Sequence, residues 1–590
     1  TASNYTITGG THTLDKIITD ADTTLKVLGS LNLSRTDSGT SKVGDLEFVP
    51  FGSAPSLSVN DMGLTIANAA QINGVSLNMS NGGELILQNG GTFDNSNVDF
   101  NDSVFKPTGA VSVTNSGFNL HGTSSVVLQG DTTFSQSGDI YWPGLDLGGN
   151  SLTFGSEVVS ISIGEALSIA NGESLISGAS RLHFENILEI DDGGELISGT
   201  GDVRVMAPLT LNGELEQGGG VIDLVQGGTV GATGKLDVSD SELKLGAALN
   251  ISGTLAANSA SQWGGWSGSL DLTAGTLEAA GGSLSLSQFS TGGGTTLKLS
   301  ADTEITSTGD YTFGTVNLSG KKLTMGGNGG MTLPNALTMT AGSKIETKTS
   351  DLTLSSALQL TTGSITSTGG TISLDGGATL SNSGQLDVSG TNLKVKQALN
   401  LSGGTFTSNA SSVLDLQTAA TLTSSSPVSF KKVNLNNKVL TLGSAGTHLK
   451  LTDSNETLSL NNLALETGAG SLTLAGPLSL SNNGQLNSTA GTITLSSGGS
   501  AVSGATVSIP GSTLVLQSGL SLSGSTLKAS GTTFTTNNNT IALNGSILEV
   551  QGTQDLTGVV PNTSSTLRLG ANANIDSSSA LSVGTLDLAN

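Results

Sequence analysis

A short acidic stretch followed by an arginine is the part of the sequence whose residue types come closest to a catalytic set. Asp191, Asp192 and Glu195 are followed by Arg204. Several carboxylates and a cation gathered on one face are what the cleavage of an acidic polysaccharide requires. Asp-Asp-Gly-Gly-Glu is also an ordinary acidic turn between strands, because Asp and Gly both favour turn conformations. We therefore expect a turn here, and we predict that the chain is not an enzyme.

Two of the three tryptophans, Trp263 and Trp266, lie in the glycine-flanked stretch Ser-Gln-Trp-Gly-Gly-Trp-Ser-Gly. Indole rings beside glycines can stack on a sugar ring, so the pair is a candidate ligand-binding site for surface glycans. The alternative is that both rings fill an insertion, because the spacing of apolar pairs lapses between Leu245 and Leu270. Packing is the simpler interpretation, and the sequence leaves both open.

Metal and thiol chemistry has little support in the sequence. The chain has no cysteine, which excludes disulfides, Cys-ligated zinc and thiol catalysis. Its four histidines are isolated from other metal-ligating residues; they are His12, His121, His183 and His448. The calcium-binding repeat Gly-Gly-x-Gly-x-Asp is absent from the sequence, although dispersed carboxylates leave Ca²⁺ open as a ligand. We expect no cofactor.

The composition disfavours several classes of partner. The formal net charge is −24 and only 22 Lys and Arg residues are spread over 590 positions, so we expect no nucleic-acid partner. No apolar run approaches the roughly 18 residues that a transmembrane helix needs. Glycine accounts for 83 residues, and only 3% of the chain is aromatic, so a large aromatic core is excluded. Disorder is disfavoured because the apolar residues are periodic.

The elements that must position these residues are short strands that recur at a nearly fixed interval. Residues 352–435 contain five apolar pairs, each split by one polar residue: Leu352/Leu354, Ile372/Leu374, Leu393/Val395, Leu414/Leu416 and Val433/Leu435. Two further apolar series run between these pairs, so each period holds three strands. The pattern predicts an all-β fold, a right-handed parallel β-solenoid with three short strands per turn of about 21 residues.

Longer repeats lie over this period. Residues 203–255, 352–406 and 472–527 resemble one another, which indicates duplicated groups of turns. We expect a continuous solenoid over residues 111–590 and a less regular solenoid or cap over residues 1–110.

Two features of the segment 1–110 point away from regular turns. The apolar spacing over residues 14–28 is compatible with an amphipathic helix that caps the first turn, and a strand, a corner and a second strand is the alternative. Pro50 and Pro55 interrupt the strand pattern, so we expect a loop or an irregular turn within residues 43–105.

The Leu-x-Leu strands, the Gly, Ser and Asn corners and the duplicated groups of turns resemble the β-helical stalks of secreted bacterial adhesins. These include filamentous-haemagglutinin-like proteins and autotransporter passengers. The resemblance implies a secreted or cell-surface location and a structural role, as an adhesin stalk or a subunit of a fibre. The alternative is a carbohydrate-binding or carbohydrate-cleaving β-helix like those of phage tailspikes and pectate lyases.

The strand pattern extends to both ends of the sequence. Tyr5 and Ile7 form the first apolar pair, and Leu586 and Leu588 form the last. Open strand edges pair readily, so we predict that these residues pair with further turns of a longer chain or, head to tail, with copies of the same chain. Thr1 opens the sequence without a signal peptide, as in a processed protein or a fragment. About 28 turns rising about 4.8 Å each would give a rod about 130 Å long.

Overall fold

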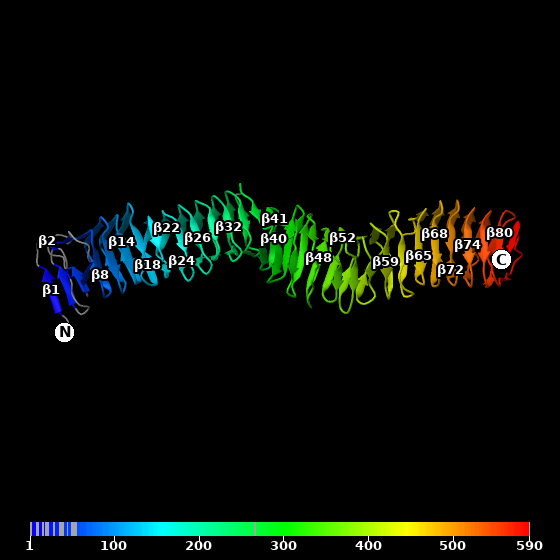
Figure 1. Cartoon of the computed structure of the whole chain (residues 1–590), viewed down its shortest axis with the longest axis horizontal. Helices are drawn as coiled ribbons and strands as arrows, with labels where there is room; N and C mark the ends of the chain where they lie inside the picture. Colours follow the sequence, from blue (N-terminus) through cyan, green and yellow to red (C-terminus); the bar gives the residue numbers. More distant parts are fainter. Residues whose placement is uncertain are drawn as a thin grey trace. The chain divides into compact units, whose positions relative to one another are not determined.

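The computed structural model describes residues 3–7, 11–14, 17, 23–27, 30–34, 40–43, 45–48, 56–264 and 267–588. The regular elements in these residues are strands, from β1 (Ser3–Ile7) to β82 (Thr585–Leu588). The described residues include no helix that is long and apolar enough to cross a membrane. The chain divides into a first compact unit, Thr1–Leu284 with Gln288–Thr291, and a second, Ser285–Ser287 with Gly292–Asn590. Each unit is a stack of turns made of short parallel strands (Figure 1).

In the first unit, most strands pair with the strand that occupies the same place in the next turn, although β16 (Gly117–His121) does not pair with β19 (Gly138–Trp142), nor β20 (Gly144–Asp146) with β23 (Leu167–Ile169). Its longest sheet begins with β1, β3 (Thr23–Val27), β6 (Asp45–Phe48) and β9 (Ala70–Asn73) and continues in steps of three to β39 (Thr276–Ala279). On a second face, the inward column Ile163, Phe184, Val205, Leu224 and Leu245 is in register from each turn to the next. This in-register stacking at a nearly constant interval confirms the predicted parallel β-solenoid.

The second unit repeats this arrangement. One of its faces carries two sheets in succession. The first includes β47 (Met331–Leu333), β49 (Leu352–Leu354), β52 (Thr371–Leu374), β55 (Asn392–Val395), β58 (Val413–Leu416) and β61 (Lys432–Asn434). The second contains β64 (Leu458–Asn461), β67 (Leu478–Ser481), β70 (Gly499–Val502), β73 (Leu520–Ser523), β76 (Ile541–Asn544) and β79 (Val559–Pro561). The predicted pairs Leu352/Leu354, Ile372/Leu374, Leu393/Val395 and Leu414/Leu416 are stacked in register in the first of these sheets.

The core of each unit is the stack of inward-facing side chains. Along a strand these side chains alternate with outward-facing ones, so Ile372 and Leu374 are fully buried while Thr371 and Ser373 are only partly covered. A thin column of aliphatic side chains is enough, since each turn buries its inner face against the turns on either side. This explains how a chain with so few aromatic residues folds.

The corners are stacked as well. One column consists of Asn462, Asn482, Ser503, Gly524 and Gly545, whose φ angles lie between +49° and +62°. This left-handed backbone conformation is accessible to Gly and tolerated by Asn, which explains why these residue types punctuate the strands. The corner must therefore be rebuilt from compatible residues in every turn.

The three duplicated segments correspond to whole turns. Residues 203–255 span strands β28 (Val203–Val205) to β36 (Thr254–Ala257). Residues 352–406 span β49 to β57 (Thr405–Thr407), and residues 472–527 span β66 (Ser471–Leu474) to β74 (Thr526–Ala529). Each copy therefore holds nine strands, which make three turns. Duplication of complete turns preserves the register of the stack.

The N-terminal region differs from one expectation and narrows another. The ends of the 14–28 segment lie in strands β2 (Thr11–Leu14) and β3 (Thr23–Val27), so the cap helix is wrong and the strand alternative holds for its described residues. From β7 (Ser56–Asn60) to β14 (Val104–Pro107) the turns are regular and pair in register, so the loop or irregular turn expected within residues 43–105 does not lie in this part. Pro50 and Pro55 lie outside the described residues.

We predict that Leu374→Asp destabilises the second unit by several kcal/mol, because it places a carboxylate between Leu354 and Val395 without a partner. Ser373→Asp should change the free energy of unfolding by no more than about 0.5 kcal/mol, because its side chain faces outward. Amide hydrogen exchange across residues 352–395 measures both effects. Equal loss of protection in the two variants would contradict the assigned facing.

Candidate binding cleft

The acidic residues that come closest to a catalytic set are not brought together with Arg204. Arg204 lies in β28 (Val203–Val205) and pairs with Asp223 in the next turn, with 3.3 Å between its Nε and the carboxylate. Glu195 belongs to β27 (Glu195–Ser198), in another sheet. Asp191 forms a turn, in which its carbonyl oxygen accepts a hydrogen bond from the Gly194 amide. The stretch is built as a corner.

Trp263 continues an inward-facing column, whereas Trp266 lies outside the described residues. Trp263 belongs to β37 (Gln262–Gly264) and is in register with the fully buried Leu243. Its ring is half-buried and meets Phe289 edge to face, with ring centroids 4.8 Å apart. This placement matches the packing interpretation for Trp263, and a sugar platform at the pair stays a prediction.

Among the residues that the structure describes, the predicted assembly edges lie in strands that pair on one side only. Strand β1, which contains Tyr5 and the half-buried Ile7, pairs with β3. At the other end β82 pairs with β80 (Thr566–Leu569), and Leu586 and Leu588 are 56% and 67% exposed. Apolar side chains on an open strand edge are the usual features of a surface that pairs with another strand.

No group of three or more His, Cys, Asp or Glu residues lies close enough to hold a metal ion in the part of the chain that the structure describes. His448 Nε2 is 2.8 Å from the Thr473 hydroxyl. Burial lowers the pKa of His448, and the nearby charge of Lys450 lowers this pKa further.

A cavity lies in the second unit, where one turn is longer than the turn before it. Phe430 is in register with Leu451 on one face, whereas Leu440 is in register with Leu465 on the next. Leu440 and Leu465 are four residues further apart in the sequence than Phe430 and Leu451 are. The later turn therefore carries four extra residues between Leu451 and Leu465. They bend the chain away from the stack and open a cleft of about 280 Å³.

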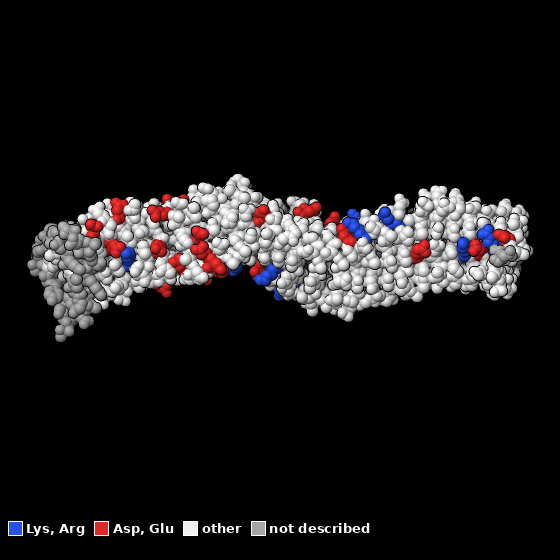
Figure 2. Space-filling view, in the orientation of Figure 1, with Lys and Arg blue, Asp and Glu red and all other residues white. Residues whose placement is uncertain are grey.

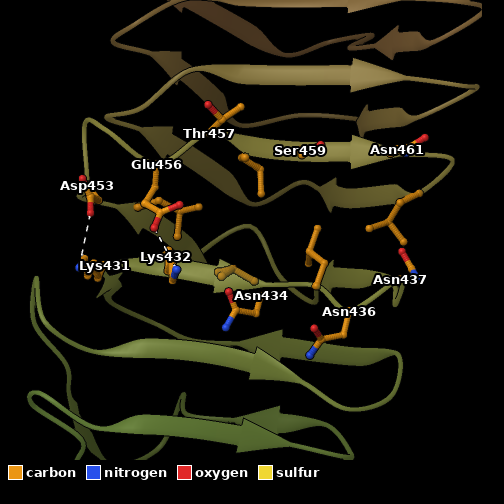
Figure 3. Close-up of a pocket in the computed structure, with 15 residues that line it drawn as sticks. Lys431, Lys432, Asn434, Asn436, Asn437, Asp453, Glu456, Thr457, Ser459 and Asn461 are labelled. Carbon is orange, nitrogen blue, oxygen red and sulfur yellow. Dashed lines mark hydrogen bonds and ion pairs between the residues drawn. The ribbon is translucent and has the colours of Figure 1, made fainter.

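Two sheet edges face each other across this cleft. Strand β61 is the last of its sheet and pairs only with β58, while β64 is the first of the next sheet and pairs only with β67. Backbone hydrogen bonds join the two turns as far as the Asp453 amide, which donates to the Lys431 carbonyl over 3.2 Å. The ladder between these turns resumes at β62 (Leu440–Leu442) and β65 (Ala464–Gly468). Figure 3 shows the gap between the two strands.

The floor of the cleft is an opened part of the apolar core. Val433 is in register with Leu414, which is 1% exposed, yet Val433 itself is half-buried because no rung covers it. Leu463 is also half-buried. An apolar group that entered the cleft would therefore cover surface that neighbouring turns cover elsewhere in the column.

The rim is polar, and two ion pairs span it. Lys432 Nζ lies 2.9 Å from a carboxylate oxygen of Glu456, and Lys431 Nζ lies 3.7 Å from Asp453. Both lysines come from the shorter turn and both carboxylates from the longer one (Figure 3). The charges balance, so these four side chains give the rim no net charge. Amides and hydroxyls complete the rim, from Asn434, Asn436, Asn437, Thr457, Ser459 and Asn461.

Sequence reasoning missed this cleft because its residues follow the ordinary strand pattern. Leu458 and Leu460 form an apolar pair like any other, and the only signal is that they follow Val433 and Leu435 at a longer interval than earlier pairs do. Removal of four residues from this interval would restore the usual step. The extra residues are most simply placed at 454–457, Ser-Asn-Glu-Thr, between the Asp453 rung and β64.

Comparison of the chain with protein-family models, curated proteins and solved structures gives no match.

Deletion of residues 454–457 should close the cleft, because it places Leu458 above Val433 and Leu460 above Leu435. We expect slower amide exchange at residues 433–435 and a gain of about 1 kcal/mol in the free energy of unfolding from burial of Val433. Replacement of the same four residues by four glycines is the matched control and should leave exchange at 433–435 unchanged. Unprotected amides at 433–435 in the deletion variant would contradict the assignment of residues 454–457 as the four extra residues.

Proposed function

We propose that this chain is a non-enzymatic, extracellular structural protein, a rigid solenoid that serves as an adhesin stalk or as a subunit of a surface fibre. The observation that carries the proposal is the way charged side chains are used. Most ion pairs among the described residues join different turns, and they support the stack that the backbone ladders build. On the face in Figure 2, charged side chains lie in small groups separated by uncharged surface.

A column near the C-terminal end of the second unit illustrates this use of charge. Lys528, Glu549, Arg568 and Asp587 occupy successive turns on the outer face of one sheet, with nitrogen-to-oxygen distances of 3.8, 3.8 and 2.9 Å. Each exposed pair contributes little by itself, so the column is better understood as fixing register between turns than as a source of stability. Fixed register is what a stack under mechanical tension requires.

The carbohydrate alternative has weaker support. It needs a groove lined by aromatic rings and carboxylates on one face, whereas Trp263 packs against Phe289 and Arg204 is paired with Asp223. The extracellular location rests on the absence of cysteine and on the resemblance to adhesin stalks.

Incubation of the chain with acidic and neutral polysaccharides tests the structural role. We expect no release of shortened products, because the acidic residues near Arg204 lie in different sheets and corners. Arg204→Ala is the control variant. Release of products by the parent chain and loss of that release in Arg204→Ala would replace the structural role with a lyase activity.

For assembly, we propose that the edges of β1 and β82 pair with further strands, from more turns of a longer chain or from another copy. Substitution of both Leu586 and Leu588 by Lys should abolish end-to-end association, because charges on an edge strand oppose pairing. Val502→Lys, on a lateral surface, should leave it unchanged.

Light scattering and electron microscopy of the isolated chain at rising concentration measure this association. Unbranched filaments that the double Lys variant no longer forms are the expected result. Persistent monomers of the parent chain would rule out self-assembly and leave the stalk role.

A further inference from the structure

We propose that the cleft between β61 and β64 binds an extended polypeptide segment, which pairs with a strand edge and places an apolar side chain over Val433. The proposal concerns the cleft alone and does not depend on the structural role of the rest of the chain. It follows from three properties of the cleft: its strand edges, its apolar floor and its lining residues.

The strand edges supply the backbone recognition. A strand that pairs on one side leaves backbone donors and acceptors available on the other, and an extended peptide satisfies them by continuing the ladder. Here two such edges face each other, since β61 ends one sheet and β64 begins the next. In the regular turns of this face the same position is filled by the strand of the following turn, for example β58 above β55. A guest strand would supply the backbone pairing that is missing beside β61, where the longer turn displaces β64.

The floor supplies a place for a side chain. Val433 is the last member of the inward column Leu352, Ile372, Leu393 and Leu414, all of which are at most 1% exposed. In a turn of the usual length Leu458 would be in register above Val433. The four extra residues shift Leu458 out of that position. An aliphatic side chain of the guest would fill this position, and its polar neighbours in the peptide would face the amide and hydroxyl groups of the rim.

The lining residues distinguish a peptide from a saccharide. None of the fifteen side chains that line the cleft is aromatic, so no ring is available to stack on a sugar. The four charged groups are already joined in pairs between Lys431 and Asp453 and between Lys432 and Glu456, which removes the net charge that an acidic or basic ligand would need. Backbone pairing and one apolar contact remain, and an extended peptide uses both.

Selection from a phage-displayed library of random nonapeptides on the intact chain tests the proposal. Val433→Trp, whose indole fills the space above the floor, serves for counter-selection. The matched control is Val502→Trp, which makes the same change on the exposed surface of the same unit. Circular dichroism confirms that both variants fold, and the deletion of residues 454–457 provides a second way to close the cleft.

Enriched peptides are then synthesised with a fluorescent label and measured by anisotropy, in native form and with alternate backbone amides methylated. We expect native peptides to bind the parent and Val502→Trp alike, and to lose at least about tenfold in affinity for Val433→Trp and for the deletion variant. The methylated peptides should lose affinity to a similar degree, because they cannot donate ladder hydrogen bonds.

Three results would overturn the proposal. One is that no peptide is enriched over the Val433→Trp background. Another is equal binding of native and methylated peptides, which would mean that backbone pairing contributes nothing. The third is binding on a glycan array that Val433→Trp abolishes, without any peptide binding, which would assign the cleft to a saccharide.

Discussion

The pairing of every strand edge with the next turn is the constraint on which the rest of this structure depends. A short parallel strand is not stable alone, and its backbone groups need partners on both sides. Each turn must therefore return to the same register at a fixed interval along the chain. The apolar columns, the left-handed corners and the charge pairs between turns all follow from that requirement. The cleft is one of the places in the second unit where two successive turns fail to satisfy it on one face.

The architecture could be predicted from the sequence because the order of apolar and polar residues shows both of its periods, the alternation along each strand and the spacing between turns. Alternation along a strand places Ile372 and Leu374 on the same inner face, and the longer period stacks them on Leu393 and Val395. Neither inference needs any distance in space. The N-terminal error arose where a local signal was given too much weight, because the helix-like spacing around Leu14 and Leu25 was overridden by strand pairing.

The candidate site was harder to predict, for a physical reason. A cleft produced by extra residues contains no special residue type, since Val433, Leu458 and Asn461 would suit any turn. What matters is which rungs fail to meet, and this depends on how the chain accommodates the longer step between Val433 and Leu458. The opposite holds for the residues that were selected in the sequence for their chemistry. Arg204 and Trp263 are distinctive in sequence, yet the fold uses one in a charge pair and the other in packing.

The longer turn also has a mechanical meaning. A pull along the stacking axis loads every junction between successive turns equally, so a stack parts at the junction with the fewest rungs. Between the turns of β61 and β64 two ladders persist, while the third face is bridged by the pairs of Lys431 with Asp453 and Lys432 with Glu456. Such pairs weaken as salt screens them, whereas backbone ladders do so far less. The junction between β57 and β60 (Pro427–Phe430) also keeps only two ladders, but the force that the β61–β64 junction withstands should fall further as ionic strength rises.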